Sequence, residues 1–217
     1  MMRKGILITL PKSDEVTEYL SVFSKPIIDV CSKKSIEIKS LDNDKANRQN
    51  FESILNSLNF KMIVFNGHGS IDSICGYKNE ELIKSGKNEN LLKERITYAR
   101  SCWAVLGLGQ KCMKDTKNGC FIGYKIPFMF LIDKTWATNP IKDKIARIFF
   151  ETSNNVPLGF IKGHSAIESH ENSKKSMLKA IKKSLRNKDK DSEAIAETLW
   201  NNYLGQEIVG NKNIKFF

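Results

Sequence analysis

The sequence predicts an α/β domain in which a mainly parallel sheet is flanked by helices on both faces. Short apolar runs rich in β-branched residues alternate with longer segments whose apolar residues recur at helical spacing. This strand–helix–strand alternation is typical of parallel strands joined by crossover helices. The chain has 217 residues, 41% hydrophobic and 27% charged, which is the size and composition of a folded domain and excludes disorder of the whole chain.

The first elements follow from the apolar pattern and from two prolines. Gly5–Leu10 is a short apolar run that ends at Pro11, as a buried strand does. Ser13 is expected to cap the helix that follows, because hydroxyl side chains satisfy free N–H groups at helix starts. Pro26 is expected to split this helix before residues 27–34.

Two further strands enclose a third helical segment. Ser35–Leu41 alternates polar and apolar residues and predicts a second strand near an edge of the sheet, and Phe60–Phe65 predicts a third. Asp44–Leu58 carries apolar residues on one helical face. Ile71–Asn90 has few apolar residues, so we expect a loop with a short turn of helix near Glu80–Lys84.

The middle of the chain continues the pattern. Arg95–Arg100 predicts a fourth strand, Trp103–Met113 a helix and Gly119–Tyr124 a fifth strand. Ile126–Leu131 fits either a strand or a loop.

The last part, residues 156–217, is expected to form a helical, basic portion of a single domain that spans residues 1–217. Amphipathic patterns predict helices over Ile141–Glu151, Ser173–Leu185 and Ser192–Leu204. Ile208–Phe217 is expected to end the chain as a strand, and Val156–Ile161 stays ambiguous.

Charge and cysteine content limit the classes of function. The net charge of +11 favours acidic partners, although Lys is spread along the chain as on an ordinary basic surface. The five cysteines are odd in number and form no Cys-x-x-Cys pair, so neither a disulfide framework nor a zinc ribbon is expected. The polar start and the lack of an apolar run of about 18 residues predict a cytoplasmic protein without a membrane span.

Two side chains with complementary chemistry follow neighbouring predicted strands. The third strand leads into Asn66-Gly67-His68-Gly69, and the fourth leads into Ser101-Cys102. Because sites in open parallel sheets lie at the carboxyl ends of the strands, we expect His68 and Cys102 to project from the same edge.

These residue types suit nucleophilic catalysis. A thiolate at Cys102 is a nucleophile, and its expected place at the start of a helix would lower its pKa. His68 can take the thiol proton and return it to a leaving amine. The backbone N–H groups of Gly69 and Cys102 can form an oxyanion hole, since glycine lets the backbone approach a substrate closely.

The apolar strand, the Asn66-Gly67-His68-Gly69 tip and a second apolar strand that ends in Ser101-Cys102 resemble the caspase-like cysteine peptidases. Trp103-Ala104-Val105-Leu106-Gly107 and Phe121-Ile122-Gly123-Tyr124 also look like the bacterial CHAT type, and the gingipain- and clostripain-like enzymes are similar. The resemblance covers roughly residues 3–150.

The resemblance implies a caspase-hemoglobinase fold and hydrolysis of peptide bonds by a Cys102–His68 dyad, with Gly69 and Cys102 as the oxyanion hole. It implies no cofactor and no metal, and it suggests a specific protein target, a separate activating partner and a role in bacterial defence or cell death. Arg100-Ser101-Cys102-Trp103-Ala104 departs from the Gln-Ala-Cys-x-Gly signature, so cleavage after Asp does not follow. Asp72 and Asp133 are candidates for binding a basic substrate side chain.

Other patterns leave two alternative functions open. His164, Glu168 and His170 lack the spacing of a zinc protease, and we expect them to be solvated. The basic run Lys174–Lys190 is expected to be a solvated helix face, and contact with nucleic acid is its alternative use. The alternatives to a peptidase are therefore a caspase-like interaction module with an idle dyad and a basic nucleic-acid-associated protein.

Overall fold

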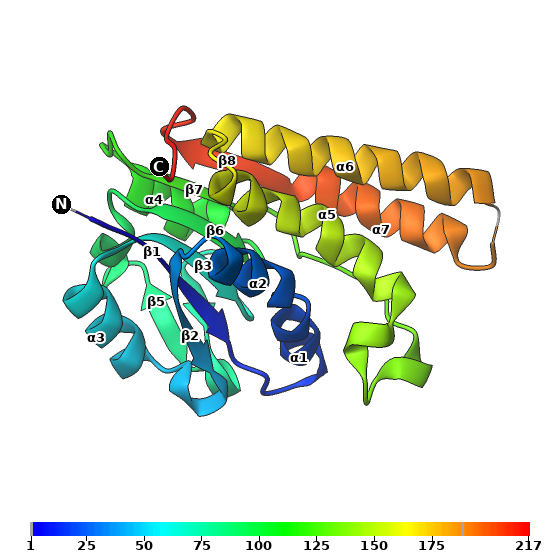
Figure 1. Ribbon diagram of the computed structural model, residues 1–217, viewed down its shortest axis with the longest axis horizontal. Coiled ribbons are helices and arrows are strands. Elements are labelled where there is room, and N and C mark those ends of the chain that lie inside the picture. Colours follow the sequence, from blue (N-terminus) through cyan, green and yellow to red (C-terminus); the bar gives the residue numbers. More distant parts are fainter. Residues whose placement is uncertain (1, 188) are drawn as a thin grey trace.

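The architecture is a six-stranded sheet between two layers of further structure (Figure 1). A computed structural model of the chain describes residues 2–187 and 189–217. The strand order in the sheet is β2-β1-β3-β6-β7-β8. These strands are β1 (Arg3–Leu10), β2 (Glu37–Asp42), β3 (Phe60–Asn66), β6 (Ile96–Arg100), β7 (Cys120–Tyr124) and β8 (Gln206–Gly210).

All neighbouring strands from β2 to β7 run parallel, and β8 is antiparallel to β7. The predicted α/β class with a mainly parallel sheet is confirmed. The chain crosses over between β1, β2, β3, β6 and β7 through helices and loops, as parallel pairing requires.

Helices cover both faces of the sheet. They are α1 (Glu15–Val22), α2 (Lys25–Lys33), α3 (Arg48–Leu58), α4 (Gln110–Met113), α5 (Lys144–Ile161), α6 (Ala166–Asn187) and α7 (Ser192–Gly205). One apolar cluster joins α1, α2 and α5 to one face of the sheet, and a second joins α3 and α4 to the other. Because both faces are covered, β1, β3, β6 and β7 are buried almost throughout, as continuous apolar runs predict.

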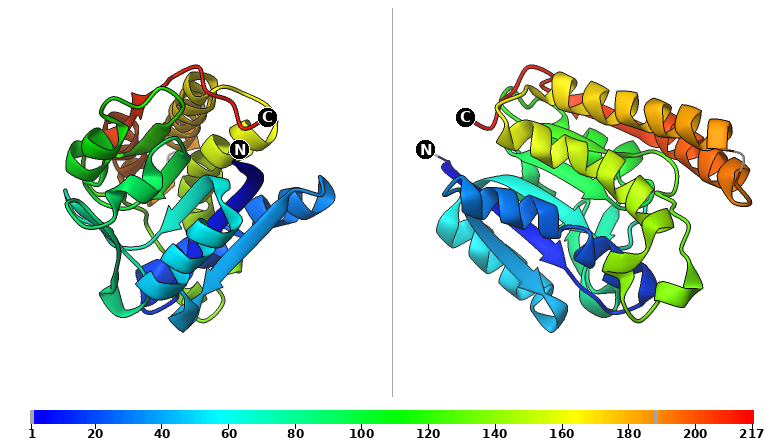
Figure 2. Two further views of the ribbon diagram at one scale, coloured as in Figure 1. Left: turned by 90° about the vertical axis from the view of Figure 1, so that its left-hand side faces the viewer. Right: turned by 45° about the vertical axis from the view of Figure 1, so that its right-hand side comes forward.

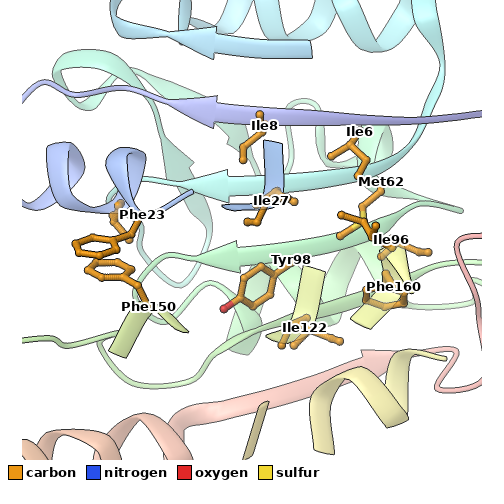
Figure 3. Close-up of a cluster of buried hydrophobic side chains, with 14 of the residues drawn as sticks. Ile6, Ile8, Phe23, Ile27, Met62, Ile96, Tyr98, Ile122, Phe150 and Phe160 are labelled. Carbon is orange, nitrogen blue, oxygen red and sulfur yellow. The ribbon is translucent and has the colours of Figure 1, made fainter. Parts of the chain in front are cut away.

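The cluster that joins α1, α2 and α5 to the sheet combines aliphatic and aromatic side chains (Figure 3). Phe23 and Phe150 stack with ring centroids 4.7 Å apart, and Tyr98 and Ile122 project from the sheet toward them. Aromatic pairs of this kind stabilise a core beyond the area they bury. They tie the first helices of the chain to α5.

The C-terminal helices α6 and α7 lie side by side and pack with α5 (Figures 1 and 2). A small separate cluster that includes Phe149, Met177, Ile195 and Leu199 joins these three helices. Strand β8 follows α7 directly and completes the edge of the main sheet.

Several boundaries differ from the expectations. Asp14, and not Ser13, caps α1: its carboxylate accepts from the Thr17 backbone N–H at 2.8 Å, and the Thr17 hydroxyl accepts from the Asp14 N–H. Pro26 lies in the first turn of α2, where its missing N–H costs nothing. The ambiguous Val156–Ile161 segment is the end of α5. In the last predicted strand, only the part up to Gly210 is β8.

The segment predicted as a loop over Ile71–Asn90 contains an antiparallel hairpin of β4 (Ser73–Cys75) and β5 (Glu81–Lys84). The short helical turn expected near Glu80–Lys84 lies just before it, as a 3-10 turn over Tyr77–Asn79, and Glu81–Lys84 itself is a strand. Ile74, Leu82 and Ile83 are fully buried against the sheet, and three such residues in two very short strands give too weak a periodic signal to be recognised in the sequence.

The segment predicted as a helix over Trp103–Met113 begins differently. Trp103 has a left-handed backbone (φ +56°), a wide π-helical turn follows over Val105–Gly109, and only Gln110–Met113 is α-helical. The alternative of a loop is correct for Ile126–Leu131. Among residues 2–187 and 189–217, no helix combines the length and the apolar character needed to cross a bilayer.

Candidate functional site

Four loops meet where the central parallel strands end. Asp14 follows β1, His68 follows β3, Cys102 follows β6 and Phe128 follows β7. β1 pairs with β3, β3 pairs with β6, and Asn66 lies opposite Arg100 in the last register position of β3 and β6. The structure thus places the His68 and Cys102 loops on adjacent strand ends, as expected from the sequence.

The His68 and Cys102 loops are joined by direct contacts. The Ser101 hydroxyl donates to the Gly67 carbonyl oxygen at 2.9 Å. A Cβ atom at Gly69 would lie 2.8 Å from the Ser101 Cβ and 3.2 Å from the Cys102 carbonyl oxygen. Only glycine permits this approach, so Gly69 holds the two loops together at the distance that a shared site needs.

His68 is oriented by a residue that the sequence pattern did not reveal. Its Nε2 atom lies 2.9 Å from Oδ2 of Asp14, across 54 residues of sequence. Partial burial on its own would raise the pKa of Asp14, but hydrogen bonds from the Thr17 backbone, from His68 and from the Thr17 hydroxyl lower the pKa below 3.8. Asp14 is therefore a carboxylate at neutral pH, and it can hold a proton on Nε2 and leave Nδ1 as the basic atom.

The surroundings of Cys102 keep it a thiol at rest. Burial raises its pKa above 9.0, and the backbone groups of Phe128 and of Cys102 itself oppose this only in part. Cys102 does not start an α-helix, because Trp103 has a left-handed backbone. The expectation that a helix start lowers the pKa of this thiol is therefore wrong. Within the described residues, no hydrogen bond joins Cys102 to His68.

Two backbone N–H groups in the site have no oxygen acceptor. In the part of the chain that the structure describes, neither the Gly69 N–H nor the Cys102 N–H donates to a backbone or side-chain oxygen, and the Cys102 N–H faces its own sulfur. The hairpin next to them is closed by other bonds, from the Cys75 N–H to the His68 carbonyl and from the Ser70 N–H to the Ser73 carbonyl. Free N–H groups on loops that touch are what an oxyanion hole requires.

The two predicted substrate-binding carboxylates lie in different settings. Asp72 accepts from the Ser70 hydroxyl at 2.7 Å and borders a surface hollow with Ile71 and Trp103. Asp133 caps a short 3-10 turn and accepts from the backbone and hydroxyl of Thr135, which lowers its pKa.

A buried cation lies beneath the site. Arg100 is 1% exposed, and its guanidinium donates to Oδ1 of Asn66 at 2.8 Å, to Oδ1 of Asn154 at 2.9 Å and to Oγ of Ser24 at 2.6 Å. Burial lowers its pKa, but an arginine stays charged in proteins. Arg100 ties the ends of β3 and β6 to α5 and to the start of α2.

The other histidines have structural contacts. His170 is buried and its Nε2 lies 3.2 Å from the Gln206 carbonyl oxygen, so the expectation that it is solvated is wrong. Glu168 accepts from the Ser165 N–H and hydroxyl at the start of α6. Between residues 2 and 217, with residue 188 left aside, no three His, Cys, Asp or Glu side chains come together as a metal site.

Comparison of the chain with models of known protein families gives no match, and a search of curated proteins also finds none. The geometry at the strand ends is therefore the basis for assigning a function. Asp14 is the residue that sequence analysis missed in this geometry. Its only local signal was an acidic residue three positions before Thr17, which indicates a helix cap and not a site.

Proposed function

We propose that the chain is a caspase-like cysteine endopeptidase in which Cys102 is the nucleophile and His68 the general base. The observation that carries the proposal is the contact between the His68 and Cys102 loops, fixed by Ser101 and Gly69, on which the Gly69 and Cys102 N–H groups have no oxygen acceptor within the described residues. The strand order, with one antiparallel strand at the end of a parallel sheet, is compatible with the caspase-like fold.

In the first step, the Cys102 sulfur attacks the carbonyl carbon of the peptide bond and its proton moves to His68. This transfer is needed because the thiol is protonated at rest. The carbonyl oxygen becomes negative and is stabilised by the Gly69 and Cys102 N–H groups. The C–N bond then breaks, His68 gives its proton to the leaving amine, and a thioester remains on Cys102.

In the second step, His68 takes a proton from water, and the hydroxide attacks the thioester carbon. The C–S bond breaks, the acid product leaves, and His68 returns its proton to the Cys102 thiolate, which restores the thiol and the neutral imidazole. Asp14 stabilises the positive charge that forms on His68 in both steps, because its carboxylate lies 2.9 Å from Nε2. Asp14 therefore acts as a positioning residue, and it does not contact the substrate.

The test is cleavage of a mixed peptide library by the purified chain, with Cys102→Ala as the matched variant and a thiol-reactive inhibitor as a third arm. Cleavage that disappears in Cys102→Ala and in the inhibited protein supports a cysteine peptidase. Cleavage that persists in Cys102→Ala shows that another group is the nucleophile and refutes the assignment.

A chain without turnover in this assay needs a second measurement, because a partner-gated enzyme and an idle module both give that result. A peptide with a thiol-reactive group at its cleaved end labels an intact site without turnover. Labelling of Cys102 that slows at least tenfold in His68→Ala supports an enzyme awaiting a partner. Labelling that is equal in both proteins supports the interaction module. Full activity of the isolated chain counts against gating by a partner.

A second candidate function, binding of nucleic acid, is favoured by one face of α6. Lys175, Lys179, Lys182 and Arg186 are exposed and recur every three to four residues, so they form a row about 16 Å long. Lys175 pairs with Glu171 at 3.7 Å, and the other three cations have no ion pair within the described residues. Like charges at this spacing destabilise a helix, unless a partner neutralises them.

Phosphate contacts make binding depend strongly on salt. If the row binds a nucleic acid backbone, the logarithm of the association constant should fall with the logarithm of salt concentration with a slope of about −3 to −4 for four cations. Fluorescence anisotropy of labelled DNA and RNA measures this slope. Lys179→Glu combined with Lys182→Glu should abolish binding, whereas weak binding that does not change with salt rejects this function.

A further inference from the structure

Three large apolar side chains are exposed around the candidate nucleophile. Trp103 is 41% exposed, Leu106 45% and Ile71 56%. Trp103 directly follows Cys102, and Ile71 lies three residues after His68. Exposed apolar groups that stand alone are ordinary on protein surfaces, but a group of them beside a reactive thiol marks a binding surface.

The backbone holds Trp103 in an unusual conformation. Its φ of +56° lies in the left-handed region, which bulky side chains rarely adopt. Strain of this kind persists only where surrounding contacts enforce it, and it gathers at functional sites. Trp103 lies in the loop that ends β6, where this conformation replaces the expected start of a helix and turns the chain sharply after Cys102.

The Ile71 side of this surface is fixed by close backbone contacts. The Leu108 N–H donates to the Ile71 carbonyl oxygen at 2.7 Å. A Cβ atom at Gly107 would lie 2.5 Å from that oxygen and 2.6 Å from the Ile71 side chain, so only glycine fits there. The wide π-helical turn Val105–Gly109 thus holds Ile71 next to the residues that follow Cys102, and both walls of the surface are rigid.

Between these walls lies an open hollow lined by Ser70, Ile71, Asp72 and Trp103. No cationic side chain lines it, and its single carboxylate disfavours an acidic ligand. One oxygen of Asp72 already accepts from Ser70, which in turn lies 2.9 Å from the Ser73 hydroxyl. The second Asp72 oxygen stays available, but most of the lining is apolar and comes from the indole of Trp103 and the aliphatic side chain of Ile71.

We propose that this hollow is a substrate subsite that binds a large aliphatic or aromatic side chain next to the bond that Cys102 cleaves. The inference rests on the proposed peptidase function, because adjacency to the nucleophile is what selects a peptide side chain as the occupant. Trp103 and Ile71 are its substrate-binding residues. Burying the indole face and the Ile71 side chain under an apolar group supplies the binding free energy.

The test uses peptides that differ only in one residue beside the cleaved bond, which is Leu, Phe, Ala, Arg or Asp. We expect kcat/KM for the Leu and Phe peptides to exceed that for the Ala peptide at least tenfold. Trp103→Ala and Ile71→Ser should reduce this ratio to below about threefold and change mainly KM. Trp136→Ala is the matched control, because Trp136 is 37% exposed in another loop and should leave the ratio unchanged.

Two further measurements separate a failed subsite from a failed peptidase. The same peptides with a thiol-reactive group at the cleaved end label Cys102. The ratio of the labelling rates of the Phe and Ala peptides reports the preference of the subsite even in a protein that cleaves no peptide. Trp103→Gly tests whether the protein tolerates loss of the side chain, because glycine adopts this backbone without strain. A labelling ratio below twofold in the wild type, an unchanged ratio in Trp103→Gly, or a preference for Arg or Asp would overturn the subsite.

Discussion

Replacing Arg100 with Leu should destabilise the fold and slow the reactions of Cys102. A buried arginine usually pairs with a carboxylate, but the three close acceptors of Arg100 are neutral: Asn66, Asn154 and Ser24. The guanidinium therefore acts as a planar clamp between four segments, and its hydrogen bonds must offset the cost of burying its charge.

The size of the effect follows from the acceptors that Arg100→Leu leaves behind. The amide nitrogens of Asn66 and Asn154 donate to the Thr9 and Phe23 carbonyls, so their Oδ1 atoms are left without a donor. Each buried orphan costs about 1–3 kcal/mol, which gives about 2–6 kcal/mol for the pair. Arg100→Leu also removes the free-energy cost of burying a charged guanidinium, and this gain offsets part of the penalty. The expected loss in the free energy of unfolding is therefore about 2–4 kcal/mol.

Urea unfolding measures this loss of stability: the urea concentration at the midpoint of unfolding should fall, while the dependence of the unfolding free energy on urea concentration stays the same. Arg100→Lys retains the charge but cannot span three acceptors, so we expect it to lose at least as much stability as Arg100→Leu. Arg3→Gln is the control, because Arg3 is exposed and should change stability by less than about 0.5 kcal/mol. Rates of Cys102 labelling in the folded variants report on the positioning of the site.

A loss below about 1 kcal/mol for Arg100→Leu would refute this reasoning, because it would show that the burial cost of the charge cancels the network. Stability of Arg100→Lys equal to that of the wild type would refute the planar clamp. If both variants fold and label Cys102 at the wild-type rate, Arg100 serves stability alone and does not position the site.

Three further outcomes follow from the site. Gly69→Ala should lower the free energy of unfolding by about 1–3 kcal/mol and reduce turnover strongly, because its Cβ would lie 2.8 Å from the Ser101 Cβ. Urea unfolding measures the stability and peptide cleavage measures the turnover. Full activity of this variant would contradict the close approach of the two loops. Alkylation of Cys102 by iodoacetamide should rise about tenfold per pH unit between pH 6 and pH 8, because burial raises the pKa of this thiol. A plateau below pH 7 would indicate a thiolate at rest. The lowered pKa of Asp14 means that its support of His68 is fully present above about pH 4 and is lost as pH falls through that pKa. Asp14→Asn should therefore lower kcat about tenfold or more at neutral pH and leave KM nearly unchanged. A kcat equal to that of the wild type would show that Asp14 has no role in the mechanism.

Local patterns were sufficient where one segment supplied the whole signal. The strands β1, β3, β6 and β7 were recognised because strands buried on both faces consist mainly of apolar residues. Helical periodicity predicted that α3, α5, α6 and α7 exist and came close to the extents of α3 and α7. It did not show that α5 continues from Glu151 to Ile161 or that α6 begins at Ala166 instead of Ser173. The placement of His68 and Cys102 at one edge followed from a general property of parallel sheets, because both residues come directly after their strands.

Local patterns failed where several weak contacts decide the conformation. The hairpin of β4 and β5 forms because three short-strand residues reach the core, which no periodicity shows. The chain after Cys102 has a left-handed backbone at Trp103 and Gly107 packs closely on Ile71, whereas helical propensity alone favours a helix from Trp103 onward.

The sequence by itself determined the alternation of strands and helices, the two loops that carry an imidazole and a thiol, and the glycine between them. Only the tertiary structure decided which distant side chains serve those loops. Asp14 reaches His68 across 54 residues, and Arg100 joins segments as far apart as Ser24 and Asn154. Burial, which depends on all layers of the fold, also decides the protonation of Cys102. The physical reason is that strand and helix formation depend on near neighbours, whereas partners and solvation depend on packing between segments far apart in the chain.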